Sequence, residues 1–121
     1  MSRRSMPVAV AERFNADMAS ARAEARAGDE AAAWALLEQA HVLSQPWAWP
    51  HIKVHGAMLA LGWRTRDSHE VRGQLLRIVV AGPGSLTGRY PEGNTGRASV
   101  PATQPMPVRE DLRALLEVTD V

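Results

Sequence analysis

The sequence contains no cysteine among its 121 residues. Disulfides, thiolate zinc sites, iron–sulfur clusters and cysteine nucleophiles are therefore excluded. Any metal ion held by this chain must use histidine, carboxylate, methionine or water as its ligands.

Long apolar runs and a strong excess of one charge are also missing. No segment approaches the roughly 18 apolar residues of a membrane-spanning helix, and the start of the chain has no apolar run of signal-peptide length. The 14 Lys and Arg residues nearly balance the 13 Asp and Glu residues, whereas nonspecific nucleic-acid binding usually needs a clear basic excess. We therefore expect a cytoplasmic protein with neither a membrane nor a nucleic acid as its partner.

The length suits a single domain with one hydrophobic core. Apolar residues recur at helical spacing through the first two thirds of the chain, which predicts a helical core over residues 8–82. We expect residues 1–7 to be disordered, residues 83–107 to form an extended Gly/Pro-rich wrap, and residues 108–118 to form a short terminal helix. The fold class is therefore all-α, with antiparallel helical hairpins arranged as a four-helix bundle or in a tetratricopeptide-like way.

Helix-starting and helix-ending residues divide the core into four helices. Gly28 is expected to end the first helix in a left-handed conformation, and Asp29 to cap the second. Pro46 ends the second helix, Pro50 fits the first turn of the third, and Asp67 or Ser68 caps the fourth. Gly82-Pro83-Gly84 is expected to end the fourth helix.

Hydrophobic periodicity also predicts which residues face the core. On the fourth helix the expected core face comprises Val71, Leu75, Ile78, Val79 and Gly82. Trp34 and Trp63 have core-facing spacings, whereas Trp47 and Trp49 lie in the linker between the second and third helices. If that linker is extended, alternation places both of its tryptophans on one side, as walls of a pocket or as a dimer contact.

The histidines indicate a metal site. His51 and His55 are four residues apart on the third helix, and Glu38 and His41 are three apart on the second, so each pair shares a helix face. The short link between these helices places both pairs at the same end of a hairpin. Three imidazoles and a carboxylate suit zinc, iron, copper or nickel, so we expect Glu38, His41, His51 and His55 to be ligands. His69 is not included.

Other interpretations of the same residues remain open. The histidines could be structural, as caps or hydrogen-bonding groups between helices, or one could serve in general acid–base catalysis. The HxxxH pair lacks the catalytic glutamate of zincins, and a ferritin-like di-iron site would need a second Glu-x-x-His pair. No Ser/His/Asp or paired-carboxylate arrangement is evident, so no catalytic residue is assigned. Glycines between Arg89 and Arg97 could approach an anion or simply form a covering loop.

From about residue 36 to residue 116 the sequence resembles a family of short bacterial proteins known only as a domain of unknown function. The resemblance rests on Ala40-His41, the His51-x-x-x-His55 pair followed by ML-x-LGWR, EV-x-GQLLR from Glu70, GSLTGR-x-P-x-GNTG, and Pro105-Met106-Pro107. It implies that the Gly-rich segment belongs to the domain. It implies no activity, and His69 falls outside its pattern.

We therefore predict a small helical protein that binds a divalent transition metal or a small ligand. The alternative is a tetratricopeptide-like adaptor with structural histidines, which would bind a protein partner or a second copy of itself through exposed arginines and the linker tryptophans.

Overall fold

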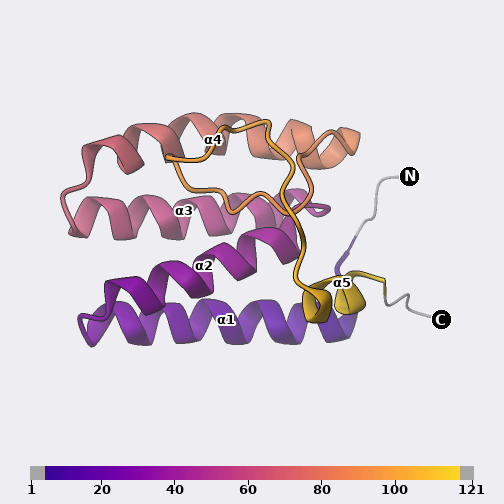
Figure 1. Ribbon diagram of the computed structural model, residues 1–121, viewed down its shortest axis with the longest axis horizontal. Helices are drawn as coiled ribbons and strands as arrows, with labels where there is room; N and C mark the ends of the chain where they lie inside the picture. The colour runs from indigo at the N-terminus through magenta and orange to yellow at the C-terminus, as the bar shows by residue number, and fades with distance from the viewer. Residues whose placement is uncertain (1–4, 118–121) are drawn as a thin grey trace.

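The computed structural model describes residues 5–117, and within this range all regular structure is helical. Helix α1 (Val8–Arg26) pairs with α2 (Glu30–Ser44), α3 (Ala48–Arg64) pairs with α4 (Ser68–Thr87), and α5 (Glu110–Leu116) closes the chain. The two hairpins stack through α2 and α3 (Figure 1). The expected all-α fold is confirmed. No helix in the described range is long and apolar enough to cross a membrane.

Parts of two expectations fall outside the described residues. These are the predicted disorder of residues 1–7, as far as it concerns residues 1–4, and the last residue of the predicted helix over 108–118.

The caps that separate the helices follow from local chemistry. Gly28 follows α1 with a φ of 84°, a left-handed conformation that glycine adopts without steric cost. The carboxylate of Asp29 accepts a hydrogen bond of 3.0 Å from the backbone N–H of Ala32, and Asp67 accepts one of 3.1 Å from that of Glu70. These bonds satisfy backbone donors that the first turns of α2 and α4 leave without helical partners.

Helix α4 continues past its expected end at Gly82. It runs to Thr87 with Pro83 inside it, and Gly88, with a φ of 72°, forms its left-handed cap. Pro83 removes a single backbone donor in the second half of the helix, and the neighbouring residues continue the helix around it. The extension matters because it places Ser85 on the buried side of α4.

Two apolar clusters form the core. The larger joins α1, α2 and α3 and contains Phe14, Ala21, Ala33, Trp34, Leu37, Ala40, Val54, Met58 and Leu61. The smaller seats α5 and contains Val10, Val42, Leu43, Trp47 and Leu112. The small alanines allow close approach of the helices, and the predicted burial of Trp34 is confirmed.

The predicted core face of α4 is wrong in part. Leu75 is 51% exposed and Val79 is 71% exposed, whereas the buried positions include the polar residues Glu70, Gln74, Arg77 and Ser85. These residues form a helical stripe of their own, and their buried groups find hydrogen-bond partners in α3 and the wrap. Hydrogen bonding therefore overrides the hydrophobic pattern in orienting this helix.

The tryptophan expectations also need correction. Trp63 is 74% exposed, although its spacing predicted a core position. Trp49 lies within α3, so the linker is not extended at this point, and the two tryptophans do not share a side: Trp47 is buried and Trp49 exposed.

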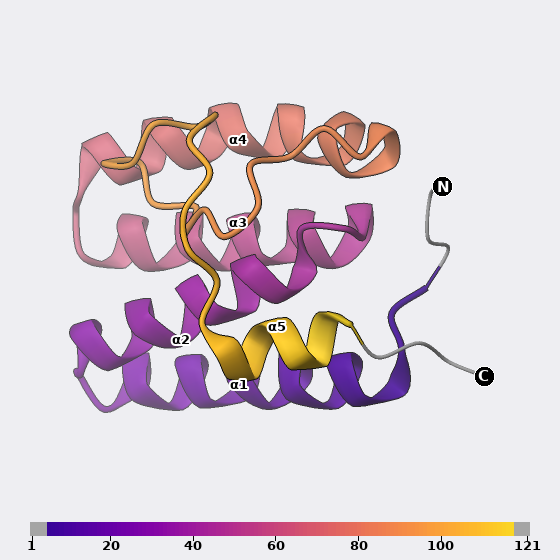
Figure 2. The ribbon, with the colours of Figure 1, turned by 45° about the vertical axis from the view of Figure 1, so that its right-hand side comes forward.

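The wrap spans residues 88–109 and not the expected 83–107, because α4 runs to Thr87 and α5 begins at Glu110. It crosses the face of α3 and α4 and then descends past α2 to α5, beside α1 (Figure 2). Buried Gln45 holds it by donating to Pro91 O at 2.8 Å and accepting from the backbone N–H of Gly93 at 3.1 Å. Buried Asn94 holds it internally by donating to Pro101 O and Gln104 O. The Gly-rich segment is thus an ordered part of the domain.

Candidate metal centre

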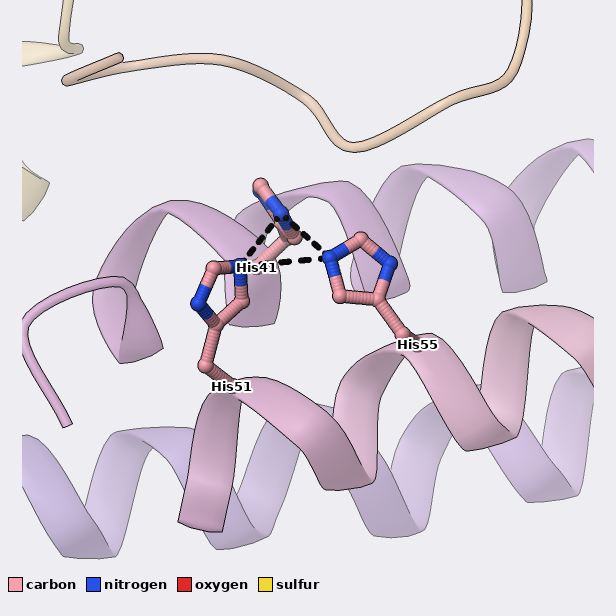
Figure 3. Close-up of side chains that lie close together, drawn as sticks. All are labelled: His41, His51 and His55. Carbon is pink, nitrogen blue, oxygen red and sulfur yellow. Dashed lines mark hydrogen bonds between the residues drawn. The ribbon is translucent and has the colours of Figure 1, made fainter. Parts of the chain in front are cut away.

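Three histidines meet between α2, α3 and the wrap. His41 lies near the end of α2, and His51 and His55 lie one turn apart on α3, with their rings pointing toward one another (Figure 3). The Nε2 atoms are 3.0 Å apart for His41 and His51, 3.1 Å for His41 and His55, and 3.2 Å for His51 and His55. All three side chains are buried. The sequence thus identified correctly which histidines would come together.

In two of these rings the other nitrogen, Nδ1, faces a group that must accept a hydrogen bond. His41 Nδ1 lies 2.6 Å from the carbonyl oxygen of Asn94, which can only accept. His51 Nδ1 lies 2.8 Å from Ser85 Oγ. The Ser85 hydroxyl donates its own hydrogen to Gln45 O at 2.6 Å, so toward His51 it acts as the acceptor. In both rings the proton of the neutral imidazole is therefore on Nδ1.

The third ring has the same arrangement through an amide. His55 Nδ1 lies 2.6 Å from Gln74 Oε1. The amide nitrogen of Gln74 donates to Glu70 Oε2 at 2.9 Å and to Gly96 O at 2.8 Å, which fixes the amide with its oxygen toward His55. The neutral His55 ring must then carry its proton on Nδ1.

All three Nε2 atoms therefore present lone pairs to one another. Such an arrangement is repulsive without a cation between them, and it matches metal-binding histidines, which use one nitrogen as the ligand and donate from the other. A triangle with sides of 3.1 Å has its centre about 1.8 Å from each corner. The three Nε2 atoms would therefore be close enough to one another to hold one metal ion, since metal–imidazole nitrogen bonds are about 2.0–2.1 Å long.

Burial keeps these rings neutral. It is the largest cause lowering each pKa, to about 3 for His51 and about 4 for His55, and to well below the ordinary value for His41. The other two histidines lower the pKa of His41 further, and the positive charge of Arg77 lowers those of His41 and His55. A shared proton is thus disfavoured as the cation that joins the rings.

The other residues considered for the site lie elsewhere. Glu38, one turn before His41, is not part of the cluster. Its carboxyl group is half-buried, and burial raises its pKa. The positive charge of Arg97 acts to lower this pKa, and the negative charge of Glu70 acts to raise it. His69 is exposed, near Ala98 O.

Met58 follows His55 on α3 but belongs to the larger apolar cluster.

A pocket of about 350 Å³ adjoins the cluster and is bordered by all three histidines. Arg77 and Arg89 also border it, together with apolar side chains of α4 and the wrap. A larger groove of about 480 Å³ lies between α1, α2 and α3, but none of the histidines lines it. Lys53 lines that groove, away from the histidines.

A buried charged group supports the Gln74 amide. Glu70 is 2% exposed and accepts from Arg97 Nε at 2.6 Å, from the Ala98 N–H and from Gln74. The Arg97 guanidinium lies 3.8 Å from the centre of the Trp34 ring, a cation–π arrangement. This network ties the wrap to α2 and α4 and orients His55 through Gln74.

Three residues that orient the imidazoles were not predicted from the sequence, namely Gln74, Ser85 and Asn94. A signal for two of them was present: Gln74 and Ser85 share a helical stripe with Glu70 and Arg77. Asn94 gave no such signal, because it acts through its backbone carbonyl.

Residues 8–116 match the family described as "Protein of unknown function (DUF3703)". The chain belongs to the DUF3703 family. This match confirms the resemblance to a domain family of unknown function. No curated protein and no solved structure matches the chain.

Proposed function

We propose that this DUF3703 protein binds one divalent transition-metal ion through Nε2 of His41, His51 and His55. One observation carries the proposal: the Nδ1 atom of each ring faces an oxygen that must accept its hydrogen bond. Each Nε2 atom is therefore left with a lone pair, and the three lone pairs lie about 3 Å apart. Imidazole ligands suit zinc, copper, nickel, cobalt and iron.

Three protein nitrogen ligands would leave the other coordination positions of the ion free. Structural zinc sites are normally closed by four protein ligands, whereas three protein ligands are typical of sites that take water or a further ligand. The arrangement therefore favours a metal that acts on, or is ligated by, something from solution.

The test is a metal titration of protein first stripped with a chelator. We expect zinc, cobalt or nickel to bind one ion per chain by calorimetry and to stabilise the fold by about 2.7 kcal/mol when free metal is about 100 times Kd. The His51→Ala/His55→Ala variant should lose both effects. His69→Ala, which alters an exposed histidine outside the cluster, should retain both. Absence of stoichiometric binding, with an unchanged Tm for every metal, would refute the proposal.

Glu38 is tested in the same titration. If the three histidines suffice, Glu38→Gln keeps both stoichiometry and affinity. A reduced affinity would add the carboxylate to the ligand set.

A second candidate function, that of an interaction adaptor, is favoured by one observation. Large apolar side chains of α4 are exposed, namely Leu75, Leu76, Val79, Val80 and Leu86. Sedimentation of the wild type and of Val79→Glu tests the homodimer form of this function. A concentration-dependent mass that the variant abolishes would support it, and a monomer at all concentrations would exclude it.

A further inference from the structure

We propose that the metal held by the three histidines takes a small carboxylate with an apolar body as a further ligand, and that Arg77 pairs with that carboxylate in the adjoining pocket. The inference rests on the proposed metal site and adds its ligand class.

The described lining of the pocket offers the metal no anionic ligand. All three histidines border it, so a metal ion on their Nε2 atoms would lie at its wall. Among the described residues that line the pocket there is no aspartate or glutamate. The remaining positions of the metal would therefore be filled from solution, by water or by an exogenous anion.

Arg77 supplies a buried positive charge that has no ion-pair partner among residues 5–117. Its side chain donates to Gly73 O and Val100 O and is only 9% exposed. Within residues 5–117 no carboxylate lies within ion-pair distance of it. Glu70, whose charge acts on Arg77, is already paired with Arg97 at 2.6 Å. A buried charge without an ion-pair partner is costly, and an anion in the pocket would compensate it.

The positive charge of the metal would also be compensated by an anion in the pocket. Three neutral imidazoles leave a divalent ion with its full charge, and Arg77 borders the same pocket as His41 and His55. Two like charges at a buried site repel each other strongly because the local dielectric constant is low. An anion between the metal and Arg77 would attract both. Metal and anion should therefore bind cooperatively, each strengthening the other by the same factor.

The remaining lining favours an apolar carboxylate over an inorganic oxyanion. Leu76, Val80, Ala81, Tyr90 and Pro91 border the pocket, and Arg89 adds a second, exposed positive charge. The volume of about 350 Å³ lies within the range of small-molecule sites and accommodates roughly ten non-hydrogen atoms at about 30 Å³ for each.

The test uses cobalt-loaded full-length protein, because the visible absorption of cobalt(II) reports changes in its ligands. Benzoate should change the spectrum saturably. It should also tighten cobalt binding by the same factor by which cobalt tightens benzoate binding. Benzamide, a neutral analogue, should do neither. Cobalt binding without a response to benzoate would overturn this inference and leave the metal site standing. Failure to bind cobalt or any other metal would remove both. A response to phosphate alone would overturn the apolar carboxylate in favour of an inorganic oxyanion.

Variants show whether Arg77 pairs with the anion or has only a structural role. Arg77→Gln should weaken benzoate binding about tenfold or more. It should also leave benzoate-free cobalt binding unchanged or tighter, since a repulsive charge is removed, whereas structural damage would weaken it. Arg89→Gln, at an exposed position, should weaken benzoate binding several-fold without affecting folding. Arg72→Gln, an exposed α4 position outside this pocket, is the matched control. Wild-type benzoate affinity in Arg77→Gln would overturn the proposal, whatever the affinity of Arg89→Gln.

Discussion

The backbone of Gly96 lies directly against the imidazole of His41. A β-carbon at position 96 would lie 2.6 Å from Cδ2 and 2.9 Å from Nε2 of that ring. The same residue has a φ of 83° and accepts a hydrogen bond from the Gln74 amide through its carbonyl. Gly96 therefore limits the positions of both the His41 ring and the Gln74 amide, which orients His55.

Gly96→Ala is expected to displace the His41 ring and weaken zinc binding, besides lowering the free energy of unfolding. Gly28→Ala is the matched control, because Gly28 has nearly the same φ, 84°, with nothing within 4 Å of an added β-carbon. The left-handed conformation should cost each variant about 1–2 kcal/mol. Calorimetric zinc titrations and urea melts of both variants check the prediction, and equal zinc affinities would contradict the close contact with His41.

Gln74→Leu should lower zinc affinity about 10- to 100-fold, the usual effect of removing the group that orients a metal-binding histidine. The substitution removes the acceptor of the His55 Nδ1–H and the donor to Glu70. Gln104→Leu makes the same chemical change at an exposed position. Competition with a chromophoric chelator measures both affinities. An unchanged affinity in Gln74→Leu would mean that His55 does not need its partner.

The metal-free protein should lose stability as pH falls below about 6.5. The pKa of His51 is lowered to about 3 and that of His55 to about 4 by burial, so the folded state takes up protons at a lower pH than the unfolded chain. Between about pH 6.5 and pH 4 the unfolded chain binds more protons, and each buried histidine should remove about 1.4 kcal/mol of stability per pH unit.

Urea melts across this pH range measure the slope. The His51→Ala/His55→Ala variant should lose most of it, while His69→Ala should retain it. A wild-type stability that does not change over the range would show that the histidines are not buried in neutral form.

Met58→Ala should destabilise the protein by about 2–5 kcal/mol, because Met58 is fully buried in the larger apolar cluster. Met58→Leu keeps most of the volume and should cost less than about 1.5 kcal/mol. Thermal or urea unfolding measures both effects. Zinc and copper affinities should be unchanged in Met58→Leu, and a loss of copper(I) binding there would instead make the thioether a ligand.

The helical hairpins and their caps were predictable from sequence because their determinants are local. Gly28, Asp29 and Asp67 act within one turn of themselves, and the i, i+4 spacing of His51 and His55 requires only a helix. Placing His41 beside them required one further step, the short link between α2 and α3. Three of the four expected ligands therefore come together.

The orientation of α4 could not be obtained in the same way. A pattern of leucines and valines predicts the buried face only where burial is driven by apolar area. Here Gln74 and Ser85 face inward because His55 and His51 need acceptors, and Arg77 binds carbonyls of its own helix and of the wrap. The partners that lie in α3 and the wrap are at least 19 residues away in the sequence. No local pattern can therefore specify them.

The separation along the chain between the ligands and their supports has a consequence for biosynthesis. His41, His51 and His55 leave the ribosome together, but the carbonyl that fixes the His41 tautomer belongs to a residue 53 positions later, and the Gly96 carbonyl lies 22 positions beyond Gln74. Contacts that are distant in sequence form late in folding because closing a longer loop costs more entropy. Under the proposed metal site, a nascent chain would expose histidines that bind metal only loosely and exchange it quickly. High affinity would then arise only when the wrap docks, so that slow metal exchange would mark a completed molecule.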